Sequence, residues 1–410
     1  MSLKTGLIVP LVLGSLAISA SAKESNSAPV ATTATDEPLA QIALLLDTSG
    51  SMEGLIDQAR CQLWNAISEL SKASREGSTS KLEIAVYQYG SELLTEDAGF
   101  IRQVTEFTDD LDAVSRALFS LKVKGGEEFC GQVIDHALTE LTWNPAPETY
   151  KAIFIAGNES FDQGAVKFGQ ALPKALDGDV VVNSIYCFDP KSRKSGPKTT
   201  PGGATAGMEQ WEAAAKLTGG MYFQIDHNHH LPEMETPFDS RMRELNREMN
   251  KTFVWHGEGS QQAAQNQQAQ DDNAAKMSDH AFAARMSAKI GHLYHHAHHD
   301  LIDAVDHGKV DLATMPEAKM PEALQKMTPE QRDSFVEGKL AARDGIRRQM
   351  ADVIAKRHAF LQRKMSEELG EEGKPMPAFG DALVSTVRSQ AVQRGFEFDQ
   401  DEEPQVSIKP

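Results

Sequence analysis

The run DTSGS at residues 47–51 brings a carboxylate and three hydroxyl groups together directly after the apolar segment IALLL. The apolar segment predicts a buried strand, so these polar side chains lie where that strand ends. Ligand sites in open parallel sheets occur at this edge, and hard cations such as Mg²⁺, Ca²⁺ or Mn²⁺ prefer oxygen ligands. Asp47, Ser49 and Ser51 are therefore candidate ligands of a divalent cation. The alternative is a capped helix start, which the same residue types also favour.

A histidine-rich segment further along the chain is a second candidate metal site. Residues 278–307 have a helical pattern, which places a group of polar side chains opposite an apolar stripe. That group consists of His292, His295, His296, His299 and Asp303. Imidazoles four residues apart on a helix can share Zn²⁺, Cu²⁺ or Ni²⁺. The alternative is a solvated polar face without a specific ligand.

Six apolar runs with strand character precede the histidine-rich segment and alternate with helical patterns. The runs read QIALLLD, LEIAVYQYG, FIRQVTEF, KAIFIAGN, VVVNSIYCF and MYFQID. Such alternation predicts an α/β fold with a largely parallel sheet covered by helices on both faces. The helix after the first strand has apolar residues three and four positions apart, which predicts a buried stripe. The stripe is made of Leu55, Ala59, Leu63, Ile67 and Leu70.

The remainder of the chain is mainly helical in pattern. A Gln-, Ala- and Asn-rich tract over 256–277 has no aliphatic residue large enough to anchor it, so we expect a linker there. Beyond it, the stretches 278–307 and 328–368 each carry an apolar stripe. Two such helices pack as a long antiparallel helical hairpin, which predicts a domain over 278–369. We expect the C-terminal tail at 370–410 to be partly disordered.

The first 22 residues have the layout of a secretory signal peptide. Lys4 precedes an apolar stretch that ends in the small residues at 20–22. That stretch is interrupted by Pro10 and is shorter than the roughly 20 residues that span a membrane, so cleavage is favoured over anchoring. We therefore expect an exported protein, periplasmic or secreted, with no stable membrane span and a flexible leader over 23–38.

The DTSGS loop resembles the DxSxS motif of von Willebrand factor A (VWA) domains, and the wording GGEEFCG and IAGNES resembles a subgroup of exported bacterial VWA proteins. The resemblance implies a doubly wound, Rossmann-like sheet, with its helical extension, over 39–255. It also implies a metal-ion-dependent adhesion site (MIDAS), which a Thr and an Asp from two later loops complete. Glu127 stands here in place of the Thr and Asn158 in place of the Asp. Both side chains offer oxygen ligands, so we expect an atypical site for a divalent cation.

Three cysteines in an exported chain allow one disulfide. Cys130 lies in the second of these loops and Cys187 at the end of a strand, so we expect a Cys130–Cys187 disulfide that braces the second loop. The alternative is a pair of buried thiols that pack as small apolar side chains. Cys61 lies opposite the buried stripe of its helix.

The formal net charge of −18 makes nucleic acid and anionic membranes poor partners. No GxSxG, HExxH or P-loop motif occurs, so we expect no enzyme activity. The leading hypothesis is a binding module that recognises a protein partner through or beside the cation. The alternatives are a transition-metal-binding protein that uses the histidine-rich helix, a metal-dependent hydrolase, and a scaffold that forms a homo-oligomer through its helical region.

Overall fold

The computed structural model describes residues 38–50, 52–188, 204–226, 234–369 and 379–398. The expected signal peptide, nearly all of the leader, Ser51, and residues 370–378 and 399–410 of the expected tail lie outside these ranges. The described residues belong to one compact unit. Among the described residues, no helix is both long enough and apolar enough to cross a membrane.

A six-stranded sheet forms the centre of the fold, with the strand order β5-β4-β1-β6-β7-β8. Its strands are β1 (Leu39–Asp47), β4 (Lys81–Tyr89), β5 (Ile101–Thr108), β6 (Tyr150–Gly157), β7 (Val181–Phe188) and β8 (Tyr222–Asp226). Neighbouring strands are parallel except for β5, which pairs with β4 in the antiparallel direction. Numbered in chain order among themselves, the strands follow the doubly wound arrangement 3-2-1-4-5-6. The predicted fold class and all six predicted strands are confirmed.

Helices cover both faces of this sheet because alternate residues of each strand point to opposite sides. In β1, Ile42, Leu44 and Leu46 belong to one apolar core, while Ala43 and Leu45 belong to the other. The first core is covered by α1 (Glu53–Leu70) and α2 (Leu111–Ser120), and the second by α3 (Cys130–Glu140), α4 (Phe168–Asp177) and α5 (Ala204–Leu217). All five residues of the predicted stripe on α1 are buried, which confirms it.

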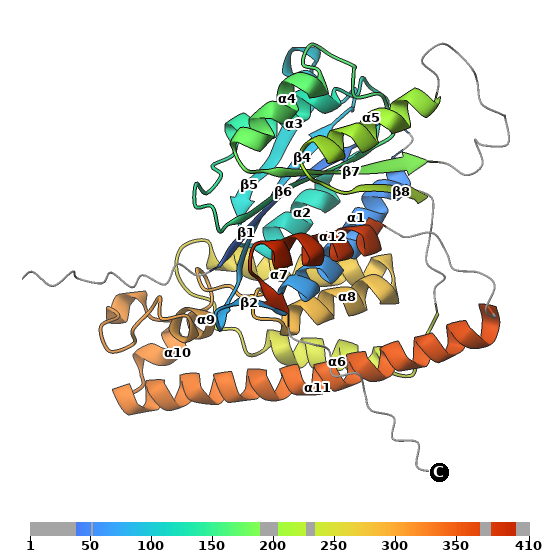
Figure 1. Ribbon diagram of the computed structural model, residues 1–410. Coiled ribbons are helices and arrows are strands. Elements are labelled where there is room, and N and C mark those ends of the chain that lie inside the picture. The colour runs from blue at the N-terminus through green and yellow to red at the C-terminus, as the bar shows by residue number, and fades with distance from the viewer. Residues whose placement is uncertain (1–37, 51, 189–203, 227–233, 370–378, 399–410) are drawn as a thin grey trace, which may run out of the picture. The chain divides into compact units, whose positions relative to one another are not determined.

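The end of the described chain returns to the first core. The sequence predicts a tail over 370–410, whereas residues 379–398 form helix α12 (Phe379–Gln393) and strand β9 (Glu397–Phe398). Strand β9 pairs with β2 (Ala73–Arg75), which also pairs with β3 (Ser78–Thr79). Figure 1 shows α12, in red, beside α1, in blue. Leu383, Val387 and Ala391 of α12 are buried against the sheet, so this segment is part of the domain core.

The other helices form a layer on the α1 side. They are α6 (Asp239–Asn250), α7 (Ser260–Met277), α8 (Asp279–Ile290), α9 (Leu301–Asp306), α10 (Glu322–Gln325) and α11 (Pro329–Leu369). Where we predicted a linker, α7 packs against α2 and α8. Where we predicted a helix to residue 307, α8 ends at Ile290, since Gly291 adopts extended backbone. Helix α11 packs on α6 as well as on α8, so a group of three helices within this layer replaces the predicted two-helix hairpin.

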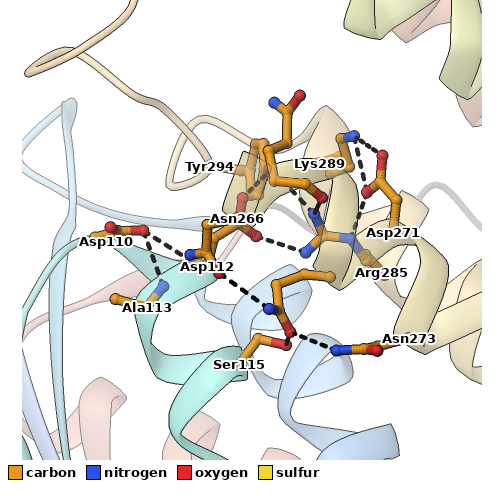
Figure 2. Close-up of polar contacts among 12 residues, drawn as sticks. Asp110, Asp112, Ala113, Ser115, Asn266, Asp271, Asn273, Arg285, Lys289 and Tyr294 are labelled. Carbon is orange, nitrogen blue, oxygen red and sulfur yellow. Dashed lines mark hydrogen bonds and ion pairs between the residues drawn. The ribbon is translucent and has the colours of Figure 1, made fainter. Parts of the chain in front are cut away.

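A buried polar network joins α2 to α7 and α8 (Figure 2). Arg285 of α8 is fully buried and forms ion pairs with Asp112 of α2 at 2.7 Å and with Asp271 of α7 at 2.6 Å. Lys289 reaches the same Asp271 at 3.0 Å, and the Tyr294 hydroxyl donates to Asp112 at 2.8 Å. Asp271 of α7, together with Gln270, which accepts from the Ser115 hydroxyl at 3.0 Å, thus finds polar partners inside the protein. Such contacts explain how a tract without large apolar residues forms a packed helix.

Candidate metal centre

Asp47 is the last residue of β1 and its side chain is completely buried. The backbone N–H of Ser49 donates to Asp47 Oδ1 at 2.7 Å, so the chain turns tightly around the carboxylate. Asp47 Oδ2 is also buried and has no hydrogen-bond partner among the described residues. A carboxylate oxygen in this condition is costly unless a proton or a cation satisfies it. Ser51, the third predicted ligand of this loop, lies outside the described residues.

The second loop brings a glutamate to Asp47, and this residue is Glu128. Glu128 is only 9% exposed, and the neighbouring Ser49 side chain opposes the rise of its pKa. Glu127, the residue that the motif comparison selects, is exposed. A Cβ at Gly90 would lie 2.8 Å from Asp47 Oδ1 and 2.9 Å from Glu128 Cγ, so only glycine leaves room for the two acids to meet. In the sequence GGEEF the two adjacent glutamates cannot be distinguished by spacing alone.

The third loop follows β6 and begins with Asn158. A Cβ at the preceding Gly157 would lie 3.1 Å from Asp47 Oδ2, so this loop passes directly beside the carboxylate. Asn158 is half-buried and Glu159 is exposed. The carbonyl oxygen of Glu159 accepts a hydrogen bond from Trp211 Nε1 at 2.7 Å, which fixes the backbone of the loop on α5. All three predicted loops therefore converge at the carboxyl edge of β1.

Both buried acids at this edge hold their protons unusually tightly. Burial raises the pKa of Asp47 to about 8, with Glu128 and Glu159 adding to the rise and the hydrogen bond from Ser49 opposing it. Burial and the neighbouring charge of Glu159 raise the pKa of Glu128 to about 7. At neutral pH Asp47 is therefore mostly protonated and Glu128 is near the midpoint of its titration. A bound cation would stabilise the ionised forms of both acids.

The donor set fits a hard cation that takes oxygen ligands. Asp47, Glu128, Ser49 and Asn158 could supply carboxylate, hydroxyl and amide oxygens, as Mg²⁺, Ca²⁺ or Mn²⁺ prefer. Within the described ranges, no three His, Cys, Asp or Glu side chains form a metal-binding group by themselves. The coordination shell would therefore need the hydroxyl and amide oxygens, together with water.

The surroundings of the loops are exposed and carry charge of both signs. Lys124 of the second loop pairs with Glu92 at 2.9 Å. The N–H of Glu92 also donates to the carbonyl oxygen of Gly125 at 2.7 Å, which ties the segment after β4 to the second loop. Leu93, in that segment, has 51% of its surface exposed. The edge of the sheet that carries the candidate metal ligands, hereafter the metal edge, thus has an apolar side chain, Leu93, on its border.

The predicted disulfide is wrong, because Cys130, Cys187 and Cys61 are all free thiols. Cys130 begins α3 and packs in the core on one face of the sheet, whereas Cys187 of β7 packs in the core on the opposite face. Both cysteines lie near the same edge of the sheet, but a disulfide also needs their side chains on the same face of the sheet. Burial raises the pKa of both buried thiols, of Cys130 and of Cys187, far above the usual range, so they stay protonated.

The five residues of the predicted histidine site do not share a helical face, because the helix ends before them. His296 is buried beside Asp112, with Nε2 3.4 Å from Oδ2. Asp303 forms an ion pair with Arg343 of α11. His292 Nε2 lies 2.9 Å from the carbonyl oxygen of Ser80, and the ring of His295 packs on that of His307. These side chains have separate structural partners, which the sequence periodicity could not reveal.

The chain is similar to several solved structures at low sequence identity. No family model matches the sequence, and no curated protein matches it. Among solved structures, similarity is found to the mussel byssus proximal thread matrix protein 1 with a zinc-occupied MIDAS motif, at 12% identity and a TM-score of 0.31, over 47% of this chain and 43% of that one. BatB from Bacteroides thetaiotaomicron matches at 16% identity and a TM-score of 0.31, over 46% of this chain and 90% of that one.

The VWA domain of SpRpn10 matches at 13% identity and a TM-score of 0.32, over 48% of this chain and 91% of that one. The chain spans less than half of the mussel protein, and at these identities no ligand or partner is transferred to it. The doubly wound sheet, with Asp47 at the carboxyl end of β1, is the fold that the resemblance of the sequence to VWA domains implies.

Proposed function

We propose that this protein is a binding module that recognises a protein partner beside a divalent cation. Asp47, Ser49 and Glu128 would hold the cation, with Asn158 from the third loop and Ser51 from the first. Binding of Mg²⁺, Ca²⁺ or Mn²⁺ would supply a charged surface group with coordination positions left for water or a partner. We further propose that the protein acts after export, on the basis of its N-terminal sequence.

The observation that carries this proposal is the condition of the Asp47 carboxylate. It is completely buried, one of its oxygens has no hydrogen-bond partner among the described residues, and a second carboxylate faces it. Nothing in folding requires two acids to meet in this way, since their repulsion and desolvation destabilise the protein. A cation between them would remove both costs.

The position of the site favours binding rather than catalysis. Gly50, Gly125, Gly126 and Glu127 are all exposed, so a large partner can reach the loops. A serine nucleophile would need a base within hydrogen-bond reach, and no hydrogen bond joins Ser49 to a histidine among the described residues. A surface with an accessible cation and no positioned base suits recognition better than hydrolysis.

Thermal unfolding with and without cation tests this proposal. The full chain should gain stability in millimolar Mg²⁺, Ca²⁺ or Mn²⁺ relative to chelator, because a ligand that binds only the folded state raises the melting temperature. Asp47→Asn should fold and lose that gain. Asp97→Asn, at an exposed aspartate in the segment between β4 and β5, should keep it. An equal gain in the Asp47 variant and the wild type would disprove a functional cation at this loop.

A further inference from the structure

We propose that the partner presents a basic side chain, Lys or Arg, beside an apolar one to the metal edge, and that it does not supply a carboxylate to the cation. This inference rests on the proposed function and deepens it by naming the chemistry of the partner. Three observations support it: several acidic groups lie at the edge, Lys124 is paired with Glu92, and Leu93 is exposed.

Four carboxylates interact at this edge. Asp47 and Glu128 are buried, and Glu127 and Glu159 are exposed on the second and third loops. The charge of Glu159 acts on both buried acids, and the charge of Glu127 acts on Glu128. A divalent cation offsets two of these four negative charges once all are ionised. The occupied edge therefore keeps two negative charges, and these lie on its exposed side.

No free positive charge of the second loop balances this excess. Lys122 and Lys124 are the basic residues there. Lys124 pairs with Glu92, so the two charges cancel. Lys122 is exposed, and its carbonyl oxygen accepts from Gln88 Nε2 at 3.3 Å, at the start of the loop rather than beside the acids. Among the described residues, Glu127 and Glu159 form no ion pair, so their charges remain for a partner to complement.

The charge of the bound cation also favours a basic partner over an acidic one. With Asp47 and Glu128 both bound, the cation is already neutralised, so it gains less from a third anionic ligand. A partner carboxylate would also have to approach Glu127 and Glu159, which repel it. A partner ammonium or guanidinium group would be attracted to these two carboxylates instead.

Leu93 adds an apolar contact at the border of the same edge. Its side chain is half exposed, although single exposed leucines are common on protein surfaces. Its position is informative because the N–H of Glu92, its neighbour, donates to the carbonyl oxygen of Gly125 in the second loop. The preferred segment of a partner therefore combines a basic residue with an apolar residue.

Binding of matched peptides to the full chain tests this inference. Fluorescently labelled, terminally blocked GLKKLG and GLEELG would be titrated with the protein in saturating Mg²⁺, and anisotropy recorded at several salt concentrations. The lysine peptide should bind more tightly, and its affinity should fall with salt. Glu127→Gln and Glu159→Gln should each weaken its binding about 2- to 5-fold, the range of exposed ion pairs. Leu93→Ser should also weaken it.

Glu337→Gln is the matched control, because Glu337 is an exposed glutamate on α11. It should leave binding of the lysine peptide unchanged. Equal losses in Glu337→Gln and in the two loop variants, tighter binding of GLEELG, or no binding of either peptide would each overturn the inference. Each of these results leaves the proposed function standing if Asp47→Asn still removes the stabilisation by the cation.

Discussion

Asp47 and Glu128 make ionisation of one another less favourable at the carboxyl edge of the sheet. Burial is the largest cause for each, and neighbouring acids add to it. Gly90 permits the contact, because any side chain at that position would collide with both acids. The two carboxylates are therefore held together by the backbone at a cost in stability, as expected where binding chemistry rather than packing decides the residues.

The raised pKa of Asp47 predicts an unusual dependence of stability on pH. The pKa rises from 3.8 in a model compound to about 8 in the folded protein, so between these values the folded state binds one more proton than the unfolded chain. The stabilisation is fully present below pH 3.8 and is lost as pH rises through about 8. In chelator, Asp47 should therefore lower the free energy of unfolding by about 1 kcal/mol per pH unit between pH 5 and 8.

Denaturant unfolding of the wild type and of Asp47→Asn at each pH measures this effect as a difference, so that the other titrating groups cancel. Excess Mg²⁺ should flatten the difference, because the cation binds the ionised carboxylate. A difference that stays constant with pH in chelator would mean that Asp47 is already ionised in the cation-free protein.

The orientation of individual side chains was the feature that the sequence predicted least well. The first loop could be placed because its polar residues follow an unmistakable buried strand. Glu128 could not be chosen over Glu127, since the choice depends on which side chain turns inward as α3 begins at Cys130. The disulfide failed for a similar reason, because the two cysteines approach one sheet edge from opposite faces.

Among the elements, α12 has the greatest consequence for the fold. It begins at Phe379, far along the chain from the sheet, and still contributes to the first core. The side chain of Gln390 accepts from the Tyr150 hydroxyl at 2.9 Å and donates to Asn183 Oδ1 at 2.7 Å, so polar as well as apolar contacts hold the helix on β6 and β7. A binding domain cut before this helix would lose part of its interior.

Leu383→Ala should destabilise the protein by about 2–5 kcal/mol, the cost of truncating a buried leucine. Leu383 is 1% exposed and borders a small internal cavity with Leu44 and Ile67. Val392→Ala, at an exposed position of the same helix, should change stability by less than about 0.5 kcal/mol. Chemical denaturation followed by circular dichroism would measure both. Equal, small effects would show that α12 does not pack on the core in solution.

The strands and α1 could be predicted because apolar periodicity reflects burial directly. The same signal failed for α7, whose buried face is polar: Asn266, Gln267, Gln270 and Asp271 all lie inside. It failed for the histidine-rich stretch in the opposite way, since an apparent helical stripe continues through Gly291 and the helix does not. Periodicity thus locates elements that bury hydrocarbon and misses those held by buried hydrogen bonds.

For the molecule as a whole, buried charges connect the helical layer to the sheet domain. Burial raises the pKa of Asp112, but Arg285 and His296 lower it more, so the carboxyl group stays ionised. Arg343 of α11 is likewise buried, between Asp300 and Asp303. Breaking such a pair leaves an uncompensated charge inside the protein and typically costs about 3–5 kcal/mol. The helical layer is therefore an integral part of the structure that presents the metal edge.

Helix α2 links the buried ion pairs to the candidate metal site. Asp112 lies in its first turn, and the second metal loop follows its last residue, Ser120. The N–H of Lys124 in that loop donates to the carbonyl oxygen of Thr48 at 3.0 Å, which joins the first and second loops. The helical layer thus supports the segment that carries Glu128.

Calorimetric titration of the full chain with Mn²⁺ at neutral pH tests the cation site most directly. The wild type should bind one ion and release protons, because Asp47 and Glu128 must ionise. Asp47→Asn should abolish binding, Glu128→Gln should weaken it about tenfold or more, or ~1.4 kcal/mol, and Glu127→Gln should leave it within about 5-fold. Unchanged Mn²⁺ affinity in Asp47→Asn, or no binding by the wild type, would contradict a cation site at this edge.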